Sequence, residues 1–165
     1  MNTQTTRIAY IAGGCFWGME ELFRMQAGII DTEVGYLGGT NDYPTYRNHP
    51  GHAEGLKITY DPKDTSFENI LDYFFRIHNP TTLDQQGNDK GSSYRSAIFY
   101  QSEKEKKESE DFVVKVNESG KWSDAVVTTL EPFIHFWPAE EEHQDYLQKH
   151  PGGYTCHVER FETFI

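Results

Sequence analysis

The spacing of apolar and polar residues along the chain predicts a series of short strands and helices. Between Glu54 and Tyr60 the apolar residues Leu56, Ile58 and Tyr60 alternate with polar ones, which is the period of a half-buried strand. Phe16, Met19 and Phe23 recur at helical spacing, and this predicts a helix from about Phe16 to Gln26. The same criteria predict strands at residues 7–12, 32–37, 95–100 and 125–134, and helices at 103–119 and 139–149.

Capping and turn signals complete this outline. Thr65 to Glu68 form a capping-box pattern ahead of an apolar stripe, and Asn79-Pro80 ends that helix. Residues 40–53 and 80–94 are polar, turn-rich loops. Helices and strands mix without strict βαβ alternation, so the fold class expected is α+β: a two-layer sandwich with a mixed sheet and flanking helices.

Length and charge restrict the class of protein. A chain of 165 residues suits one catalytic domain, with a polar leader at 1–6 and a flexible Gly/Pro-bearing C-terminal segment at 150–165. The 26 Asp and Glu residues against 15 Lys and Arg argue against nucleic-acid and membrane-surface roles. The leader has no signal-peptide pattern, and no apolar stripe demands a partner, so a cytoplasmic monomer is expected.

The chain has only two cysteines, Cys15 and Cys156. Two are too few for a disulfide scaffold, and no CxxC pair is present to bind structural zinc. In a reducing compartment they are either two free thiols or the partners of a transient, redox-active disulfide. The 3 Trp, 10 Tyr and 11 Phe residues exceed what a core needs, so some are expected to line a site.

Cys15 lies between a predicted strand and a predicted helix, directly after Gly13-Gly14. Unpaired N–H groups and the helix dipole favour an anion at such a position. There the pKa of the thiol is expected to fall from ~8.5 toward neutrality, which would make Cys15 a nucleophile. The alternative is a buried structural cysteine in a tight turn.

Trp17 and Glu54 are further candidates for the site. Trp17 lies off the apolar face of its helix, next to the thiol, and suggests a pocket for a small apolar group; the alternative is an exposed or loop-covered indole. Glu54 shares the inward parity of its strand, so burial would raise its pKa and suit it to be a general acid. Alternatively, Glu54 bends into solvent at the start of the strand.

The two loops add polar and aromatic side chains that could reach the same site. They are Tyr43, Tyr46, His49 and His52 in the first loop and Asp89 and Tyr94 in the second. Phenols can donate hydrogen bonds to an oxygen without carrying charge. A metal site of His49, His52 and Glu54 is disfavoured, because these residues lack the spacing of known metal-binding motifs.

Five blocks of sequence, in order, resemble the peptide methionine sulfoxide reductases of the A type. They are Gly14-Cys15-Phe16-Trp17-Gly18, Pro44-Thr45-Tyr46-Arg47, Gly51-His52-Ala53-Glu54, Gln86-Gly87-Asn88-Asp89 followed by Tyr94-Arg95-Ser96, and Glu142-His143-Gln144-Asp145-Tyr146. Together they extend from about Ile8 to Cys156, nearly the whole chain. One such block could arise by chance, but five in order could not.

The resemblance implies a mechanism without a bound cofactor or metal. The Cys15 thiolate would attack the sulfur of methionine S-sulfoxide, free or in oxidised proteins, and Glu54 would protonate the oxygen. Three further residues, Tyr46, Tyr94 and Asp89, would hold the oxygen and the substrate. The methyl group would meet a wall formed by Phe16 and Trp17. The products would be methionine and a sulfenic acid on Cys15.

The resemblance also implies how the sulfenic acid is reduced. Cys156 would form a disulfide with Cys15, and thioredoxin or another external dithiol would reduce it. A relay through a third thiol is excluded, because the chain has no third cysteine. The alternative for Cys156 is a bystander thiol.

Three other functions are compatible with some of these residues. A cysteine hydrolase would use Cys15 on a strand-to-helix turn, although Trp17 occupies the place of the second glycine of a nucleophile elbow. A thiol peroxidase would also make a sulfenic acid. A binding module for oxidised methionine would need neither a reactive Cys15 nor Glu54.

Overall fold

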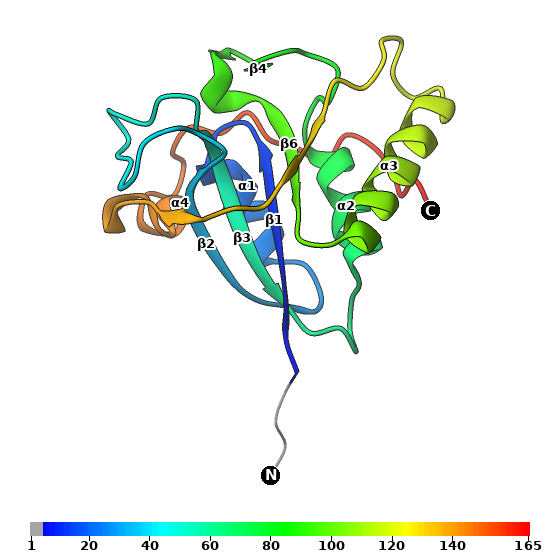
Figure 1. The fold of residues 1–165 in the computed structure, drawn as a ribbon, viewed down its shortest axis with the longest axis horizontal. Helices are drawn as coiled ribbons and strands as arrows, with labels where there is room; N and C mark the ends of the chain where they lie inside the picture. The colour runs from blue at the N-terminus through cyan, green and yellow to red at the C-terminus, as the bar shows by residue number, and fades with distance from the viewer. Residues whose placement is uncertain (1–4) are drawn as a thin grey trace.

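The computed structural model describes residues 5–165, so the first four residues of the expected leader lie outside the described part. The main strands are β1 (Arg7–Gly13), β2 (Ile29–Leu37), β3 (Ala53–Tyr60), β6 (Ser96–Tyr100), β7 (Thr129–Pro132) and β8 (Trp137–Pro138). They form one six-stranded sheet in the order β7-β6-β1-β3-β2-β8 (Figure 1). Only the β6–β7 pair is parallel, so the sheet is mixed, as expected.

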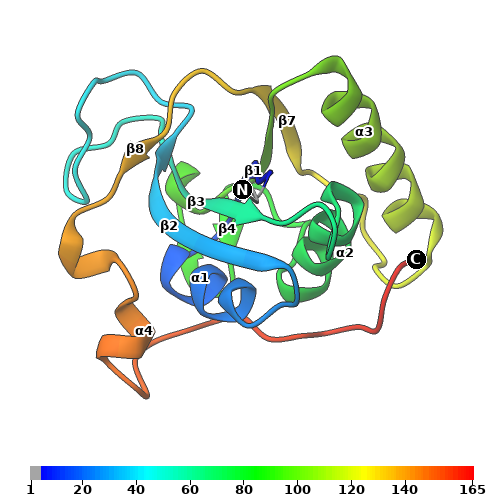
Figure 2. The ribbon, with the colours of Figure 1, turned by 90° about the horizontal axis from the view of Figure 1, so that it is seen from below.

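The two faces of the sheet are covered differently. Helices α1 (Phe16–Arg24), α2 (Phe67–Ile77) and α3 (Glu103–Glu118) lie on one face (Figure 2). Their apolar residues belong to the larger core cluster. The residues of β1 alternate between the faces: Ala9 and Ile11 belong to the helix-covered core, and Tyr10 and Ala12 to a smaller cluster. The chain between β7 and β8 covers that smaller cluster, where Tyr10 stacks on Phe133 at a centroid distance of 4.1 Å. The α+β class and the sandwich of sheet and helices are confirmed.

Several predicted boundaries were wrong. The strand expected at 125–134 is limited to Thr129–Pro132, because the chain then leaves the sheet edge to cross its other face. The helix expected at 139–149 is divided into a 3₁₀ turn at Glu141–His143 and α4 (Tyr146–Lys149). The division falls near Asp145, whose φ of 54° is left-handed and incompatible with a continuous helix.

Smaller differences concern helix ends and short strands. The N-cap of α2 is Ser66, whose side chain accepts a hydrogen bond from the N–H of Asn69, rather than Thr65. The predicted loop 80–94 contains a small hairpin of β4 (Gln85–Gln86) and β5 (Asp89–Lys90), and a 3₁₀ turn at Ser92–Tyr94. Of the described helices, none is both long and apolar enough to span a bilayer.

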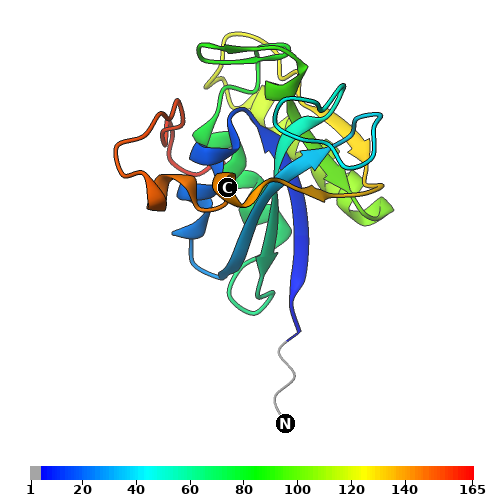
Figure 3. The ribbon, with the colours of Figure 1, turned by 90° about the vertical axis from the view of Figure 1, so that its left-hand side faces the viewer.

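The elements that carry the candidate residues meet at one end of the sheet. Strand β1 ends there and α1 begins, and the loop after β2 and the β4–β5 hairpin lie at the same end (Figures 1 and 3). The expected flexible segment at 150–165 has little regular structure but is fastened to the rest of the protein. The N–H of Arg160 donates to the carbonyl of Arg76, and the N–H of Phe164 donates to Asp72.

Candidate active site

Cys15 is the N-cap residue of α1, as the sequence predicted. The turn before it depends on Gly14, whose φ of 102° is one that residues with a Cβ rarely adopt. A Cβ at this position would also lie 2.6 Å from Cγ of Gln86. The turn therefore packs tightly under the β4–β5 hairpin, and the Cys15 side chain is only 6% exposed.

Glu54 points inward from β3, so the parity argument is confirmed. Its side chain is 1% exposed, and its Oε1 accepts a hydrogen bond from the N–H of Phe16 at 3.2 Å. Burial is the main cause that raises the pKa of Glu54 to about 8; the charge of Asp89 also raises it, and the Phe16 N–H lowers it. Glu54 is therefore mostly a neutral acid at pH 7, held at the start of α1 beside Cys15.

The expectation of a lowered Cys15 pKa was wrong for this state of the protein. Burial raises the pKa of the Cys15 thiol well above its ordinary value, and the carboxylate of Glu54 raises it further. The N–H of Trp17 at the start of the helix lowers it, but by less. The cost of desolvating a thiolate at this position is larger than the stabilisation that the helix terminus gives it, so Cys15 is held as a thiol.

Tyr46, Tyr94 and Asp89 gather around this pair from the two loops. Burial raises the pKa of both tyrosines, and the charges of Glu54, Cys15 and Asp89 raise it further in each case. A hydrogen bond with Tyr94 acts in the opposite sense on Tyr46. The two phenols are therefore protonated donors around the thiol and the carboxyl group.

Trp17 and Phe16 lie in different surroundings. Phe16 is fully buried and contacts the ring of Tyr46 at a centroid distance of 6.5 Å. Trp17 is half-buried and held on two sides. Its Nε1 donates to Nδ1 of His143 at 3.1 Å, and its ring stacks on Tyr146 at a centroid distance of 3.7 Å. The indole is therefore not freely exposed; the segment that carries His143 and Tyr146 covers it, as the loop-covered alternative describes.

His143 and Tyr146 were singled out by the sequence only as part of a block, with no role attached. Beside them lies a groove of about 570 Å³. Its lining consists of Trp17, Thr45, Tyr46, Arg47, Glu140, Glu142, His143, Tyr146 and His150. Because Trp17 and Tyr46 line the groove and also belong to the site around Cys15, the groove adjoins that site.

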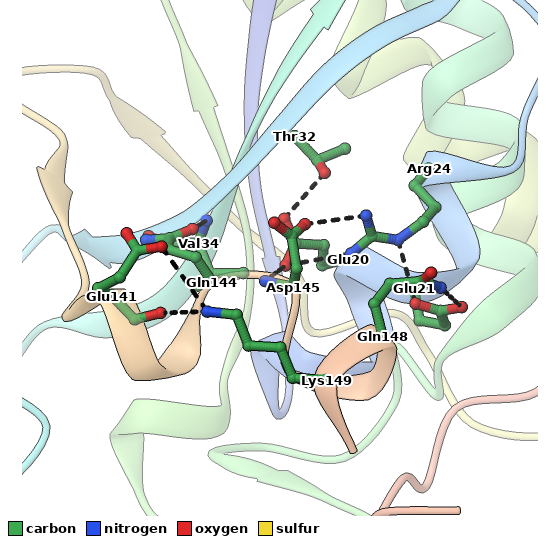
Figure 4. Close-up of polar contacts among 10 residues, drawn as sticks. All are labelled: Glu20, Glu21, Arg24, Thr32, Val34, Glu141, Gln144, Asp145, Gln148 and Lys149. Atoms are coloured by element: carbon green, nitrogen blue, oxygen red, sulfur yellow. Dashed lines mark hydrogen bonds and ion pairs between the residues drawn. The ribbon is translucent and has the colours of Figure 1, made fainter. Parts of the chain in front are cut away.

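A network of polar contacts fixes the segment that carries His143 and Tyr146 (Figure 4). Buried Glu20 on α1 accepts hydrogen bonds from the hydroxyl of Thr32 and the N–H of Asp145, both at 2.8 Å. Arg24 contacts Asp145 at 2.9 Å and Glu20 at 3.5 Å. The side chain of Gln144 bonds both the N–H and the carbonyl of Val34 on β2. The contacts that hold Trp17 thus depend on the attachment of this segment to α1 and β2.

Cys156 lies on the C-terminal segment, next to the β4–β5 hairpin. Its Sγ is 3.9 Å from the carbonyl oxygen of Gln86 and 4.0 Å from Oδ2 of Asp89. Burial raises the pKa of this thiol, and the charge of Asp89 raises it further. Both cysteines are free thiols in this structure, and the hairpin that packs on the Cys15 turn also packs on Cys156.

The remaining loop residues have other roles. Tyr43 is 82% exposed and packs on Trp137. Both ring nitrogens of His52 are bonded to the backbone of its own loop, at Gly39 and Asn41, so His52 is not available to a metal with Glu54.

Among the described residues, Glu140, Glu142 and His143 offer atoms close enough to share a cation. The indole N–H of Trp17 already donates to the lone pair on Nδ1 of His143. The neutral ring therefore carries its proton on Nε2, which is poorly suited to bind a metal.

Comparison with known proteins agrees with this geometry. The chain matches the family described as "Peptide methionine sulfoxide reductase" over residues 7–163. It is 57% identical over 155 residues to "Peptide methionine sulfoxide reductase MsrA" of Nocardia farcinica, covering 94% of this chain and 91% of that protein.

Two solved structures of a yeast protein are also similar. The reduced form of Mxr1 from Saccharomyces cerevisiae superposes with a TM-score of 0.88 at 36% identity, covering 97% of this chain and 95% of that one. The same yeast protein in complex with Trx2 gives a TM-score of 0.65 at 28% identity, covering 97% and 94%. The fold, the buried Cys15–Glu54 pair and these matches agree: the chain belongs to the peptide methionine sulfoxide reductase family and is an oxidoreductase that reduces methionine sulfoxide through a thiol.

Proposed function

We propose that Cys15 is the nucleophile that attacks the sulfur of methionine S-sulfoxide and that Glu54 is the acid that protonates its oxygen. The observation that carries this assignment is the buried Glu54 carboxyl, with its pKa raised to about 8, at the helix start that Cys15 caps. The sulfoxide oxygen is a poor leaving group until it is protonated, so attack requires an acid that is neutral at the working pH.

The protonated state of Cys15 fits the same step. Glu54 gives its proton to the oxygen, and the thiol proton of Cys15 returns to Glu54 as the sulfur attacks. Sγ of Cys15 first bonds to the substrate sulfur, whose oxygen becomes a hydroxyl. This hydroxyl then passes to Sγ, and the bonds that join the substrate sulfur to Sγ and to oxygen both break. One thiol and one sulfoxide thus become one sulfenic acid and one thioether, without a net proton change. A peroxidase would need an exposed thiolate, which burial of Cys15 opposes.

The surrounding residues orient the substrate. Tyr46 and Tyr94 donate hydrogen bonds to the sulfoxide oxygen, and Asp89 holds the substrate or a nearby water. Phe16 and Trp17 form the apolar wall for the S-methyl group. An apolar wall for the methyl group and donors for the oxygen fix two substituents of the chiral sulfur, so the site is proposed to select one hand, the S epimer.

The groove beside Trp17 and Tyr46 accommodates the chain around an oxidised methionine, so oxidised proteins and peptides are the proposed substrates, with free methionine sulfoxide as a smaller substrate. Cys156 is proposed as the resolving thiol that forms a disulfide with Cys15. Thioredoxin is proposed as the reductant; the yeast protein of similar fold was solved in complex with Trx2. We further propose a cytoplasmic monomer.

A single-turnover reaction tests the assignment. The pre-reduced protein is mixed with a peptide containing racemic methionine sulfoxide, without reductant, and the products are resolved by chiral chromatography. We expect loss of the S epimer only, one methionine per protein and loss of both thiols. Cys15→Ser should produce no methionine, and any turnover in that variant contradicts the nucleophile. Cys156→Ser should produce one methionine but no turnover with thioredoxin; undiminished turnover contradicts the resolver.

A further inference from the structure

His157 is a buried titratable residue that the reduction of the sulfoxide does not use. It is 3% exposed and follows the proposed resolving thiol directly in the chain. Its Nε2 lies 2.7 Å from the carbonyl oxygen of Gly13, in the turn that leads to Cys15. This imidazole therefore joins the C-terminal segment to the turn of the nucleophile.

The contact with Gly13 determines which ring nitrogen of His157 carries the proton. A carbonyl oxygen can only accept a hydrogen bond, so Nε2 must carry the hydrogen. Burial lowers the pKa of His157 to about 4, with a smaller contribution from the charge of Arg160, so the ring is neutral at pH 7. A neutral ring with a proton on Nε2 has a free lone pair on Nδ1.

That lone pair faces the thiol of Cys156. Sγ of Cys156 lies 3.9 Å from Nδ1, within reach of a contact to sulfur. The approach is possible because residue 18 is a glycine: a Cβ there would lie 2.5 Å from Nδ1 of His157 and 2.4 Å from the hydroxyl of Thr155. The start of α1 thus leaves room for the thiol and imidazole pair.

We propose that His157 is the general base of the resolving step, in which its Nδ1 accepts the thiol proton of Cys156 as Sγ attacks the sulfenic sulfur of Cys15. This inference rests on the proposed role of Cys156. A sulfur–sulfur bond forms and the S–O bond of Cys15 breaks. The hydroxide takes up one proton and leaves as water. A thiol and a sulfenic acid become a disulfide and water, so no oxidant or reductant is added.

The need for a base follows from the surroundings of Cys156. Burial and Asp89 raise the pKa of its thiol, so little thiolate forms by itself at pH 7. Transfer of the proton to the adjacent imidazole creates an ion pair of net charge zero, which burial penalises less than an isolated thiolate. The step therefore does not require the thiol to lose its proton to bulk water.

Two substitutions distinguish a general base at position 157 from a residue that only holds the C-terminal segment to Gly13, a role called an anchor below. His157→Gln keeps an N–H close to the position of Nε2, which can still donate to Gly13, but it has no basic nitrogen. His157→Asn has neither. In single-turnover reactions, methionine formation reports the sulfoxide step and thiol loss reports the disulfide step. We expect both variants to form the disulfide more slowly at pH 7, by about 10²-fold or more for loss of a general base.

The pH profile of the disulfide step supplies a second readout. In the wild type the base is neutral at every pH above about 4, so the rate should change little between pH 6 and 8. In His157→Gln it should rise about tenfold per pH unit, because only the thiolate then attacks. The titratable and charged groups that face the pair are Asp89, Tyr154, Arg160, His78 and Cys15; all are unchanged in both variants.

Three results would overturn parts of this reasoning. Disulfide formation by His157→Gln at the wild-type rate, with only His157→Asn slow, would show that His157 is an anchor and not a base. A wild-type rate that rises tenfold per unit from pH 6 to 8 would reject the base without use of any variant. Absence of methionine in the wild-type reaction would overturn the proposed function itself, and this inference with it.

Discussion

Substitution of Glu54 by glutamine should make the protein less active and more stable. The two side chains have nearly the same shape, and the glutamine carbonyl can still accept the N–H of Phe16, which bonds Oε1 of Glu54 at 3.2 Å. Glutamine resembles the protonated acid but has no acidic proton to give. We expect the rate of the sulfoxide step to fall by roughly 10²–10⁴-fold, the usual contribution of a general acid.

The gain in stability follows from the pKa of Glu54, which burial raises from 4.5 to about 8 in the folded protein. Below pH 4.5 the carboxyl is neutral in both the folded and the unfolded state, so the variant and the wild type should be equally stable. As the pH rises toward 8, ionisation favours the unfolded chain, and the wild type loses about 1.4 kcal/mol per pH unit. At pH 7 the difference is about 3 kcal/mol, or roughly 6–12 °C in Tm for a chain of this size.

Urea unfolding of the reduced proteins from pH 5 to 8 measures this difference, and single-turnover methionine formation measures the activity. Glu141→Gln is the matched control, because the Glu141 side chain is 91% exposed and its stability difference should stay near zero throughout. If the stability difference between Glu54→Gln and the wild type does not grow with pH, or if the variant is less stable at pH 7, the conclusion that Glu54 is a desolvated acid with a raised pKa is refuted. Unchanged activity would remove Glu54 from the chemistry.

Three further substitutions test other parts of the structure. Gly18→Ala would place a Cβ 2.4 Å from a hydroxyl of the C-terminal segment, so the segment must shift, and disulfide formation should slow by about 10²-fold in a thiol-loss assay. An unchanged rate would show that the packing of this segment on α1 does not affect disulfide formation. Arg24→Met leaves the Glu20 carboxylate buried without its cation and should lower the free energy of unfolding in urea by roughly 1–3 kcal/mol. A decrease of only a few tenths of a kcal/mol would contradict a stabilising role for these ion pairs. Tyr94→Phe removes a donor to the sulfoxide oxygen and should lower the rate of sulfoxide reduction by up to about 10²-fold, whereas Tyr43→Phe, at an exposed position, should leave that rate unchanged. Equal effects of the two substitutions would contradict the role of Tyr94 as a donor to the oxygen.

Local patterns were sufficient to locate the central pair. The apolar period of residues 54–60 placed Glu54 on the inward side of its strand, and the glycines before Cys15 predicted a thiol at a helix start; both are confirmed. These predictions succeeded because a side chain's face on a strand, and the open N–H groups at a helix start, depend only on nearby residues. The helix expected at 139–149 was wrong because the left-handed conformation of Asp145 is held by a contact from Glu20, 125 residues away in the chain.

The sequence by itself thus determined the class of fold, the order of most elements and the places of Cys15 and Glu54 in the fold. Tertiary structure alone decided their protonation and orientation. Cys15 has a raised pKa and not a lowered one, because burial of the thiol and the charge of the neighbouring Glu54 carboxylate oppose the thiolate more than the helix start stabilises it. Trp17 is oriented by His143, 126 residues away. Desolvation and contacts between distant segments exist only after the chain has folded, so no local pattern of residues encodes them.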